Sequence, residues 1–169
     1  MREDRYLKVK IIAHADKKWG IGKNNGLMFR IPKDMKFFRE TTSGAAVVMG
    51  RKTLDSFPNG QPLKNRVNIV LTGNKDFKRE GAVVCHSKEE ALEEAKKYPE
   101  VFVIGGAAVY HMFLEECDEA LITKVDADGD ADAFLDNLDS LPEWRLESES
   151  EPIEDNGYMI RFCRYVKGA

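Results

Sequence analysis

Short apolar runs recur along the whole chain, and most of them are separated by segments with helical periodicity. Several runs, such as residues 101–104, lack the alternation of a half-buried strand, which is typical of strands covered on both faces. The pattern therefore predicts buried strands in a largely parallel sheet. The eight expected strands cover residues 9–15, 45–49, 67–72, 82–85, 101–104, 121–125, 145–148 and 158–165.

Helical periodicity appears in four of the segments between these runs. The expected helices cover residues 32–42, a short stretch after Arg51, residues 88–98 and residues 107–117. Ser87 and Glu90 have the spacing of a capping box, which indicates where the third helix begins. Strands that alternate with helices predict an α/β fold in which helices flank both faces of the sheet.

A turn-like sequence at residues 154–157 precedes the last apolar run, so we expect the C-terminal strand to be antiparallel and to close one edge. The chain shows no repeat or linker composition. We therefore predict a single domain over residues 1–169, with a mostly parallel eight-stranded sheet, an antiparallel C-terminal edge strand and four flanking helices. Ligands of such sheets bind beyond the carboxyl ends of the strands.

Composition excludes several classes of protein. With 169 residues, 43% of them hydrophobic, the chain can build a packed core, and disorder is excluded. No apolar stretch approaches the roughly 20 residues of a membrane span, and the charged residues 1–10 do not resemble a signal peptide, so we expect a cytoplasmic protein. The net charge of −3 gives no general attraction to nucleic acid.

The three cysteines, Cys85, Cys117 and Cys163, are far apart and form no CxxC motif. No metal site is therefore expected.

Two junctions between a strand and a helix are candidate anion sites. Gly105 and Gly106 follow a buried strand and open a helix, which fits either a phosphate cradle or a tight turn. Residues 50–53, Gly-Arg-Lys-Thr, place two cations and a hydroxyl at another helix start. Positive charge is unfavourable there unless an anion binds, although solvated surface cations are the alternative. The chain contains neither GxGxxG nor a Walker A loop.

The remaining candidate features are a loop, a carboxylate and a histidine. The glycine-rich residues 20–26 fit a mobile lid or an ordinary connection. Asp34 lies in a first helical turn and shares a face with Phe38, so it is either a helix-dipole partner or a functional carboxylate. Strand alternation places His14 on the same side as Ile12, unless a strand irregularity turns it into solvent.

Six segments, in their order and spacing, resemble the dihydrofolate reductase family, in its bacterial form, over essentially the whole chain. The matching segments are residues 11–13, 20–24, 31–38, 47–53, 66–72 and 103–106, the last continuing through Val109 and Tyr110. Four positions depart from the family pattern: Met28 and Phe29 stand where Pro-Trp is common, His14 where a small residue is usual, and Ala133 where a threonine is usual.

The resemblance implies hydride transfer from NADPH to 7,8-dihydrofolate, giving tetrahydrofolate, in a protein that is expected to be monomeric and to bind antifolate inhibitors. It implies catalytic roles for Asp34, as the one ionisable group that assists protonation, and Thr123. The implied substrate-binding residues are Ile12, Ala13, Leu27, Asp34, Met35, Phe38, Phe57, Leu63, Arg66, Ile104 and Thr123. The implied cofactor-binding residues are Ala13, Ile21, Gly22, Gly50, Arg51, Lys52, Thr53, Thr72, Ile104, Gly105, Gly106, Ala107, Ala108, Val109 and Tyr110, with a cis bond between the two adjacent glycines.

Two other functions remain open at this point. A pyrimidine reductase of riboflavin synthesis shares the implied fold and cofactor, but its substrate does not call for Asp34 and Arg66 together. A non-catalytic NADPH-binding module would keep both anion junctions without needing Asp34. Oxidation of NADPH with dihydrofolate, with the pyrimidine, or with neither distinguishes the three.

Overall fold

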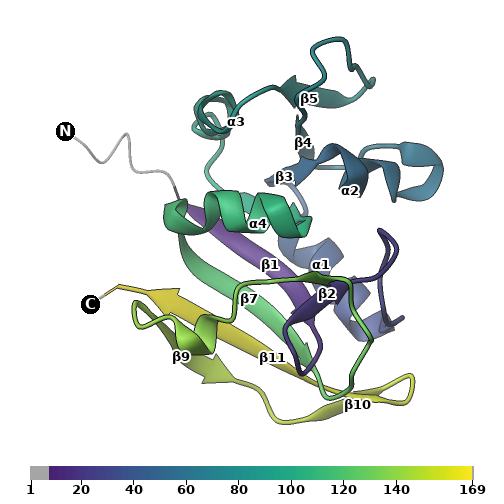
Figure 1. Ribbon diagram of the computed structural model, residues 1–169, viewed down its shortest axis with the longest axis vertical. Helices are drawn as coiled ribbons and strands as arrows, with labels where there is room; N and C mark the ends of the chain where they lie inside the picture. The colour runs from purple at the N-terminus through teal and green to yellow at the C-terminus, as the bar shows by residue number, and fades with distance from the viewer. Residues whose placement is uncertain (1–7, 169) are drawn as a thin grey trace.

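A nine-stranded sheet forms the centre of the computed structural model, which describes residues 8–168 (Figure 1). Its strand order is β10-β11-β7-β1-β6-β3-β4-β5, and β9 also pairs with β11. The strands are β1 (Val9–Ala15), β3 (Ala46–Gly50), β4 (Val67–Leu71), β5 (Ala82–Cys85), β6 (Val101–Gly105), β7 (Cys117–Val125), β9 (Trp144–Glu149), β10 (Ile153–Asp155) and β11 (Tyr158–Lys167). A second sheet pairs β2 (Gly20–Gly22) with β8 (Ala133–Phe134).

The strand pairing confirms the predicted α/β fold. All pairs from β7 through β1, β6, β3 and β4 to β5 are parallel, whereas β11 runs antiparallel to β7. All eight predicted strands are present, and β10 adds a ninth. The outer side of β11 is covered by β9 and β10, which pair with different halves of it. The three strands that were not predicted, β2, β8 and β10, have two or three residues each, too few to show a period.

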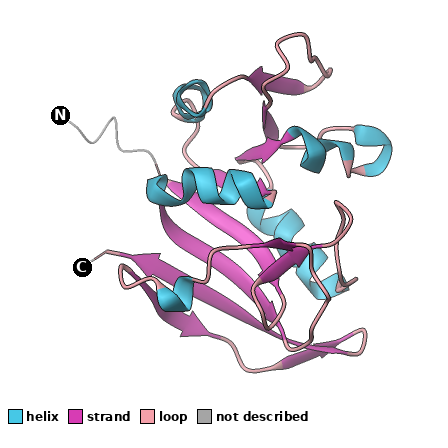
Figure 2. Ribbon diagram, in the orientation of Figure 1, coloured by secondary structure: helices cyan, strands magenta, loops and turns pink. Residues whose placement is uncertain are grey.

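Two helices cover each face of the sheet (Figure 2). The helices are α1 (Pro32–Thr42), α2 (Arg51–Asp55), α3 (Lys88–Ala95) and α4 (Ala107–Phe113). Residues of α3 and α4 pack with Val9 and Ile11 of β1, while residues of α1 and α2 pack with Ile12 on the opposite face. Successive side chains of β1 therefore pack into two separate cores, one on each face of the sheet. Because both sets are buried, the sequence of the strand is almost continuously apolar.

The helix ends show where sequence periodicity is a weak guide. Proline at the first position starts α1 at the predicted residue, since its fixed φ suits a first turn. The Ser87 hydroxyl accepts the N–H of Glu90 at 3.1 Å and caps α3, as the capping spacing predicts. However, α3 ends at Ala95 rather than residue 98, and α4 gives way to a 3-10 helix, Leu114–Glu116. Cys117 then begins β7 instead of ending the helix.

Within residues 8–168, no helix has the length and apolar character that a membrane crossing requires.

Candidate functional site

Asp34 and two residues of neighbouring strands meet at the carboxyl ends of β1 and β7. His14 and Thr123 are register partners of this parallel pair, so their side chains lie on the same face. The first turn of α1 brings Asp34 over them. The Thr123 hydroxyl donates to Asp34 Oδ1 at 2.6 Å, and His14 Nδ1 lies 3.2 Å from Asp34 Oδ2. Both oxygens of the carboxylate therefore have a partner from the sheet.

This cluster of Asp34, Thr123 and His14 is largely shielded from solvent. The side chains of His14 and Asp34 are 6% and 15% exposed, and Thr123 is buried. The ring of Phe29 lies beside that of His14, with centroids 6.0 Å apart. The structure confirms that His14 lies on the side of Ile12. It also places a second titratable side chain in contact with Asp34, while the expectation that Asp34 is the one ionisable group that assists protonation stays a prediction.

Tyr110 of α4 approaches the same strand from the opposite face. Its buried hydroxyl donates to the backbone carbonyl of Ile12 at 2.8 Å. Burial, and then the negative charge of Asp34, raise the pKa of Tyr110 well above its ordinary value of 10.0, so its hydroxyl stays protonated. Tyr110 thus connects α4 to the segment of β1 that precedes His14.

The predicted apolar wall comes together on the face covered by α1 and α2. One cluster contains five of the predicted substrate-binding residues: Ile12, Phe38, Phe57, Leu63 and Ile104. Two others, Leu27 and Met35, are 67% and 40% exposed and lie outside that cluster. Helical periodicity and family resemblance cannot separate a packed wall from an exposed rim, because both consist of apolar residues.

Arg66 lies at the far end of this wall, next to a second cation. Its guanidinium donates to the Thr42 hydroxyl at 3.0 Å, to the Lys64 carbonyl at 2.7 Å and to the Arg39 carbonyl at 3.1 Å. Burial first, and the nearby charge of Arg39 second, lower the pKa of Arg66. An anion bound between two like charges that act on each other would relieve their repulsion. Sequence reasoning did not single out Arg39.

The two candidate anion junctions lie side by side. A Cβ atom added to Gly50 would lie 3.1 Å from a methyl of Val109, so α4 packs directly against the end of β3. Gly105 has a φ of +124°, which favours glycine, and its added Cβ would lie 3.5 Å from the Thr53 hydroxyl. The peptide bond between Gly105 and Gly106 is cis, as the family resemblance implies. Tertiary contact between the two turns thus makes one glycine-lined surface.

Charged and polar residues surround this surface. The Arg51 guanidinium lies 4.3 Å from the centroid of Phe77, with Nε 3.4 Å from an Asp55 oxygen. Lys52 is exposed, and the Thr72 hydroxyl, just beyond β4, accepts the N–H of Asn74 at 3.2 Å. The other predicted cofactor residues line the start of α4 and the adjacent strands: Ala107 is half-buried, Ala108 is exposed, and Ala13 and Ile21 pack against the core on the α4 side.

The loop of residues 20–26 lies between α2 and the segment that follows β7 and is bonded to both. Asn25 Nδ2 donates to the Lys52 carbonyl at 3.0 Å, and the N–H of Asn24 donates to Asp132 Oδ2 at 3.0 Å. The carbonyl of Gly22 accepts the N–H of Asp132 at 3.0 Å. The loop is thus held by α2 on one side and by the segment after β7 on the other.

A row of ion pairs accompanies these bonds. Lys17, Lys18 and Lys23 face Asp126, Asp128 and Asp130, with N···O distances of 4.0, 3.0 and 2.7 Å in that order.

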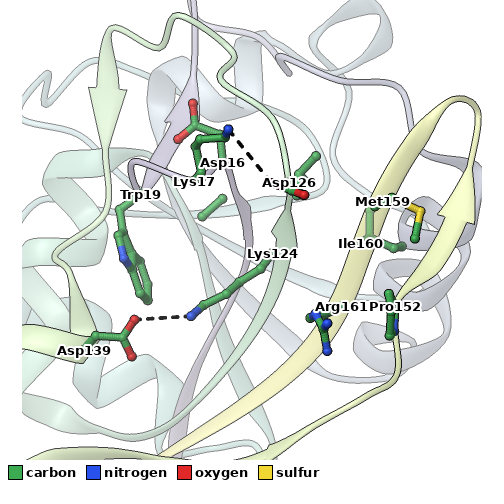
Figure 3. A pocket seen from close by; sticks show the side chains of 12 residues that line it. Asp16, Lys17, Trp19, Lys124, Asp126, Asp139, Pro152, Met159, Ile160 and Arg161 are labelled. Atoms are coloured by element: carbon green, nitrogen blue, oxygen red, sulfur yellow. Dashed lines mark hydrogen bonds and ion pairs between the residues drawn. The ribbon is translucent and has the colours of Figure 1, made fainter.

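A separate cavity of about 470 Å³ lies elsewhere in the molecule (Figure 3). It opens between the segment after β1, the end of β7 and the start of β11. The side chain of Lys124 extends from β7 into it, and its Nζ lies 5.1 Å from the centroid of the Trp19 ring and next to Asp139. None of the predicted site residues is among those that line it. Four of its charged groups pair with one another, Lys124 with Asp139 at 3.3 Å and Lys17 with Asp126 at 4.0 Å. We therefore place the functional site at Asp34 and not in this cavity.

The parallel sheet, the glycine-lined junction with its cations and the shielded carboxylate beside the apolar wall define an α/β enzyme of the nucleotide-binding class. The family model for dihydrofolate reductase matches residues 8–167. The chain belongs to the dihydrofolate reductase family.

Individual dihydrofolate reductases align with nearly the whole length of this chain. The dihydrofolate reductase of Staphylococcus haemolyticus is 35% identical over 164 residues, an alignment that covers 96% of this chain and 97% of the relative. That of Enterococcus faecium is 40% identical over 156 residues, covering 90% of this chain and 92% of the relative. A solved dihydrofolate reductase from Enterococcus faecalis, complexed with NADP(H) and RAB-propyl, superposes with a TM-score of 0.87 at 32% identity, covering 96% of this chain and 97% of that one.

Proposed function

We propose that the chain reduces 7,8-dihydrofolate to tetrahydrofolate with NADPH, and that Asp34 and Thr123 bind the pterin and assist its protonation. Membership of the dihydrofolate reductase family supports the overall reaction. The observation that carries the residue assignment is the placement of a shielded carboxylate, bonded to Thr123, at one end of the apolar wall.

The carboxylate of Asp34 suits a flat heterocycle with two adjacent N–H groups. A carboxylate accepts two parallel hydrogen bonds through its two oxygens, as it does from a guanidinium. The amino group and N3 of a pterin present such a pair. Thr123 fixes the orientation of Oδ1, and Ile12, Phe38 and Ile104 supply apolar surface for the ring.

The cation pair at the opposite end of the wall suits the glutamate tail of the substrate. Arg66 presents a planar fork of donors, which matches a carboxylate better than a lysine does. Its bonds to the Thr42 hydroxyl and two backbone carbonyls hold that fork in place, and Arg39 adds a second positive charge. The distance between Asp34 and Arg66 along the wall would then select substrates that carry a pterin at one end and a carboxylate at the other.

The glycine-lined junction fits a dinucleotide phosphate. A bulky side chain at Gly50 or Gly105 would block the approach of a ligand to the backbone, and Arg51, Lys52 and Thr53 offer charge and a hydroxyl at the same place. NADPH, when bound, supplies the hydride. Asn25 holds the 20–26 loop against Lys52, so this loop would cover the cofactor and exclude water.

The role of Asp34 is tested by the substitution Asp34→Asn. The amide keeps the shape of the side chain but cannot hold the negative charge, so turnover of dihydrofolate should fall by about 10² to 10⁴-fold. Binding of NADPH should stay unchanged, because the glycine-lined junction is untouched. Turnover is followed by the loss of NADPH absorbance, and binding by fluorescence titration.

Asp126→Asn is the matched control, since Asp126 carries the same charge but its side chain is 78% exposed. A D34N protein that keeps most of its dihydrofolate turnover would restore the reading of Asp34 as a helix-dipole partner. Wild-type activity on the riboflavin pyrimidine but not on dihydrofolate would replace the proposed substrate.

Two further predictions concern the whole chain. Both binding regions are built on one sheet, which supports the prediction that residues 1–169 form a single dihydrofolate reductase-like domain. That the protein is a cytoplasmic monomer stays a prediction, and light scattering during size-exclusion chromatography tests its oligomeric state.

A further inference from the structure

His14 is a buried titratable side chain that the proposed mechanism does not use. Its side chain is 6% exposed, and its Nδ1 lies 3.2 Å from Asp34 Oδ2. An ionised carboxylate only accepts hydrogen bonds, so the hydrogen of this contact belongs to His14 Nδ1. The contact therefore assigns the tautomer of the ring.

The surroundings of His14 leave Asp34 as its one charged neighbour in hydrogen-bond contact among the described residues. On β7 the register partner of His14 is Thr123, a neutral hydroxyl that itself donates to Asp34. The loop before α1 contributes the apolar ring of Phe29, whereas Tyr110 of α4 lies on the opposite face of β1, where its protonated hydroxyl is bonded to the Ile12 carbonyl.

The second ring nitrogen of His14 points to a role beyond packing. Within the described part of the chain, Nε2 of His14 is one of the few buried side-chain polar atoms without a hydrogen-bond partner. Buried polar atoms in native proteins are almost always paired, with protein, water or ligand. A histidine that served only to fill space would be replaced at less free-energy cost by an apolar residue. The ring is therefore placed for its contact with Asp34.

We infer that His14 is a positioning residue for Asp34: its Nδ1–H holds Oδ2 as Thr123 holds Oδ1, and thereby sets the pH range of turnover. This inference rests on the proposed function of Asp34. With both oxygens bonded from the sheet, the carboxylate plane is fixed before a pterin arrives, and each oxygen keeps a lone pair for the ligand. A carboxylate with two donors also takes up a proton less readily than one with a single donor.

Two substitutions at the same position separate this role from packing. His14→Ala removes the donor. His14→Asn keeps one, because the Asn amide nitrogen is attached at the same carbon position as Nδ1. The pH dependence of turnover at saturating dihydrofolate is measured for both, and His111→Ala is the control because His111 pairs with Asp136 on the exposed side of α4.

In the Ala variant the pH at which turnover falls to half should rise by about one unit, the scale for losing one donor to a carboxylate. The Asn variant should stay close to wild type, and the control should not change. A His14→Ala profile that superimposes on wild type, or an Asn profile shifted as far as that of Ala, overturns the inference, because the donor would then have no effect.

A second measurement does not depend on turnover. Nitrogen-15 NMR of the histidine rings in the ligand-free protein should show the His14 hydrogen on Nδ1, and this signature should be lost in Asp34→Ala. A hydrogen on Nε2 in both proteins overturns the inference even if the enzyme is active. If wild type fails to oxidise NADPH with dihydrofolate, the proposed function fails, and the NMR result still decides whether His14 holds Asp34.

Discussion

Replacing Asp16 should destabilise the base of the 20–26 loop. Asp16 is 4% exposed and accepts three backbone N–H groups: Lys18 and Gly20 donate to Oδ1, both at 2.8 Å, and Gly129 donates to Oδ2 at 2.9 Å. One buried carboxylate thus joins the segment after β1 to the segment after β7. In Asp16→Asn the amide oxygen keeps the first two bonds, but the amide NH₂ faces the N–H of Gly129.

The magnitude follows from that single mismatch. A hydrogen bond to a charged group contributes about 1.5–3 kcal/mol, and a buried donor left without a partner adds to the loss. We therefore expect the free energy of unfolding to fall by about 2 kcal/mol. For a chain of this size, this corresponds to a melting temperature about 4–8 °C lower. The backbone of Gly20 lies directly against this carboxylate, since a Cβ added there would lie 3.0 Å from both of its oxygens.

Urea unfolding followed by circular dichroism measures the effect. The matched control is Asp126→Asn, which removes the same charge from the same region at an exposed position and should stay within about 0.5 kcal/mol of wild type. If Asp16→Asn unfolds within that margin too, the three backbone bonds contribute no net stability, and the argument from buried acceptors is wrong.

Two other substitutions test the cofactor site and the core. Arg51→Ala should weaken NADPH binding by about 1.5–3 kcal/mol and NADH binding much less, since a charge-assisted bond to the 2′-phosphate is lost; equal weakening in fluorescence titrations would contradict this role. Burial raises the pKa of the Cys117 thiol from 9.0 to about 12, so the folded protein keeps a proton that the unfolded chain releases. The free energy of unfolding should therefore fall above pH 9, by at most about 1.4 kcal/mol per pH unit from this group. Cys117→Ala should lose that slope in urea unfolding at several pH values, and parallel curves for the two proteins would refute the assignment.

The elements that could be predicted from the sequence are those with a strong local signal. β1, β5 and α1 begin and end at the predicted residues, since apolar runs or an initial proline mark their limits. β7 begins at Cys117, four residues before the predicted start. The early start was missed because the first residues of the strand include polar ones such as Glu119, which pairs with Lys10 of β1. That pairing depends on the neighbouring strand and leaves no local pattern.

The same division applies to the candidate site. Alternation predicts the side of β1 on which His14 lies, but its contact with Asp34 requires the placement of α1 over two strands. The cation pair of Arg39 and Arg66 and the bond from Asn24 to Asp132, 108 residues apart, depend on long-range packing. Single-sequence patterns contain no information on such distances, whereas a family resemblance transfers them residue by residue.

The row of lysine–aspartate pairs beside the 20–26 loop makes the loop sensitive to ionic strength. Exposed pairs of this kind contribute little one by one, and at 1 M salt the screening length of about 3 Å is comparable to their separations. The bonds of Asp16 are buried or half-buried and resist screening far better. Concentrated salt should therefore weaken the contact of Lys23 with Asp130 and loosen that side of the loop, while the hydrogen bonds of Asn24 and Asn25 and the base at Asp16 stay attached and the sheet below stays intact.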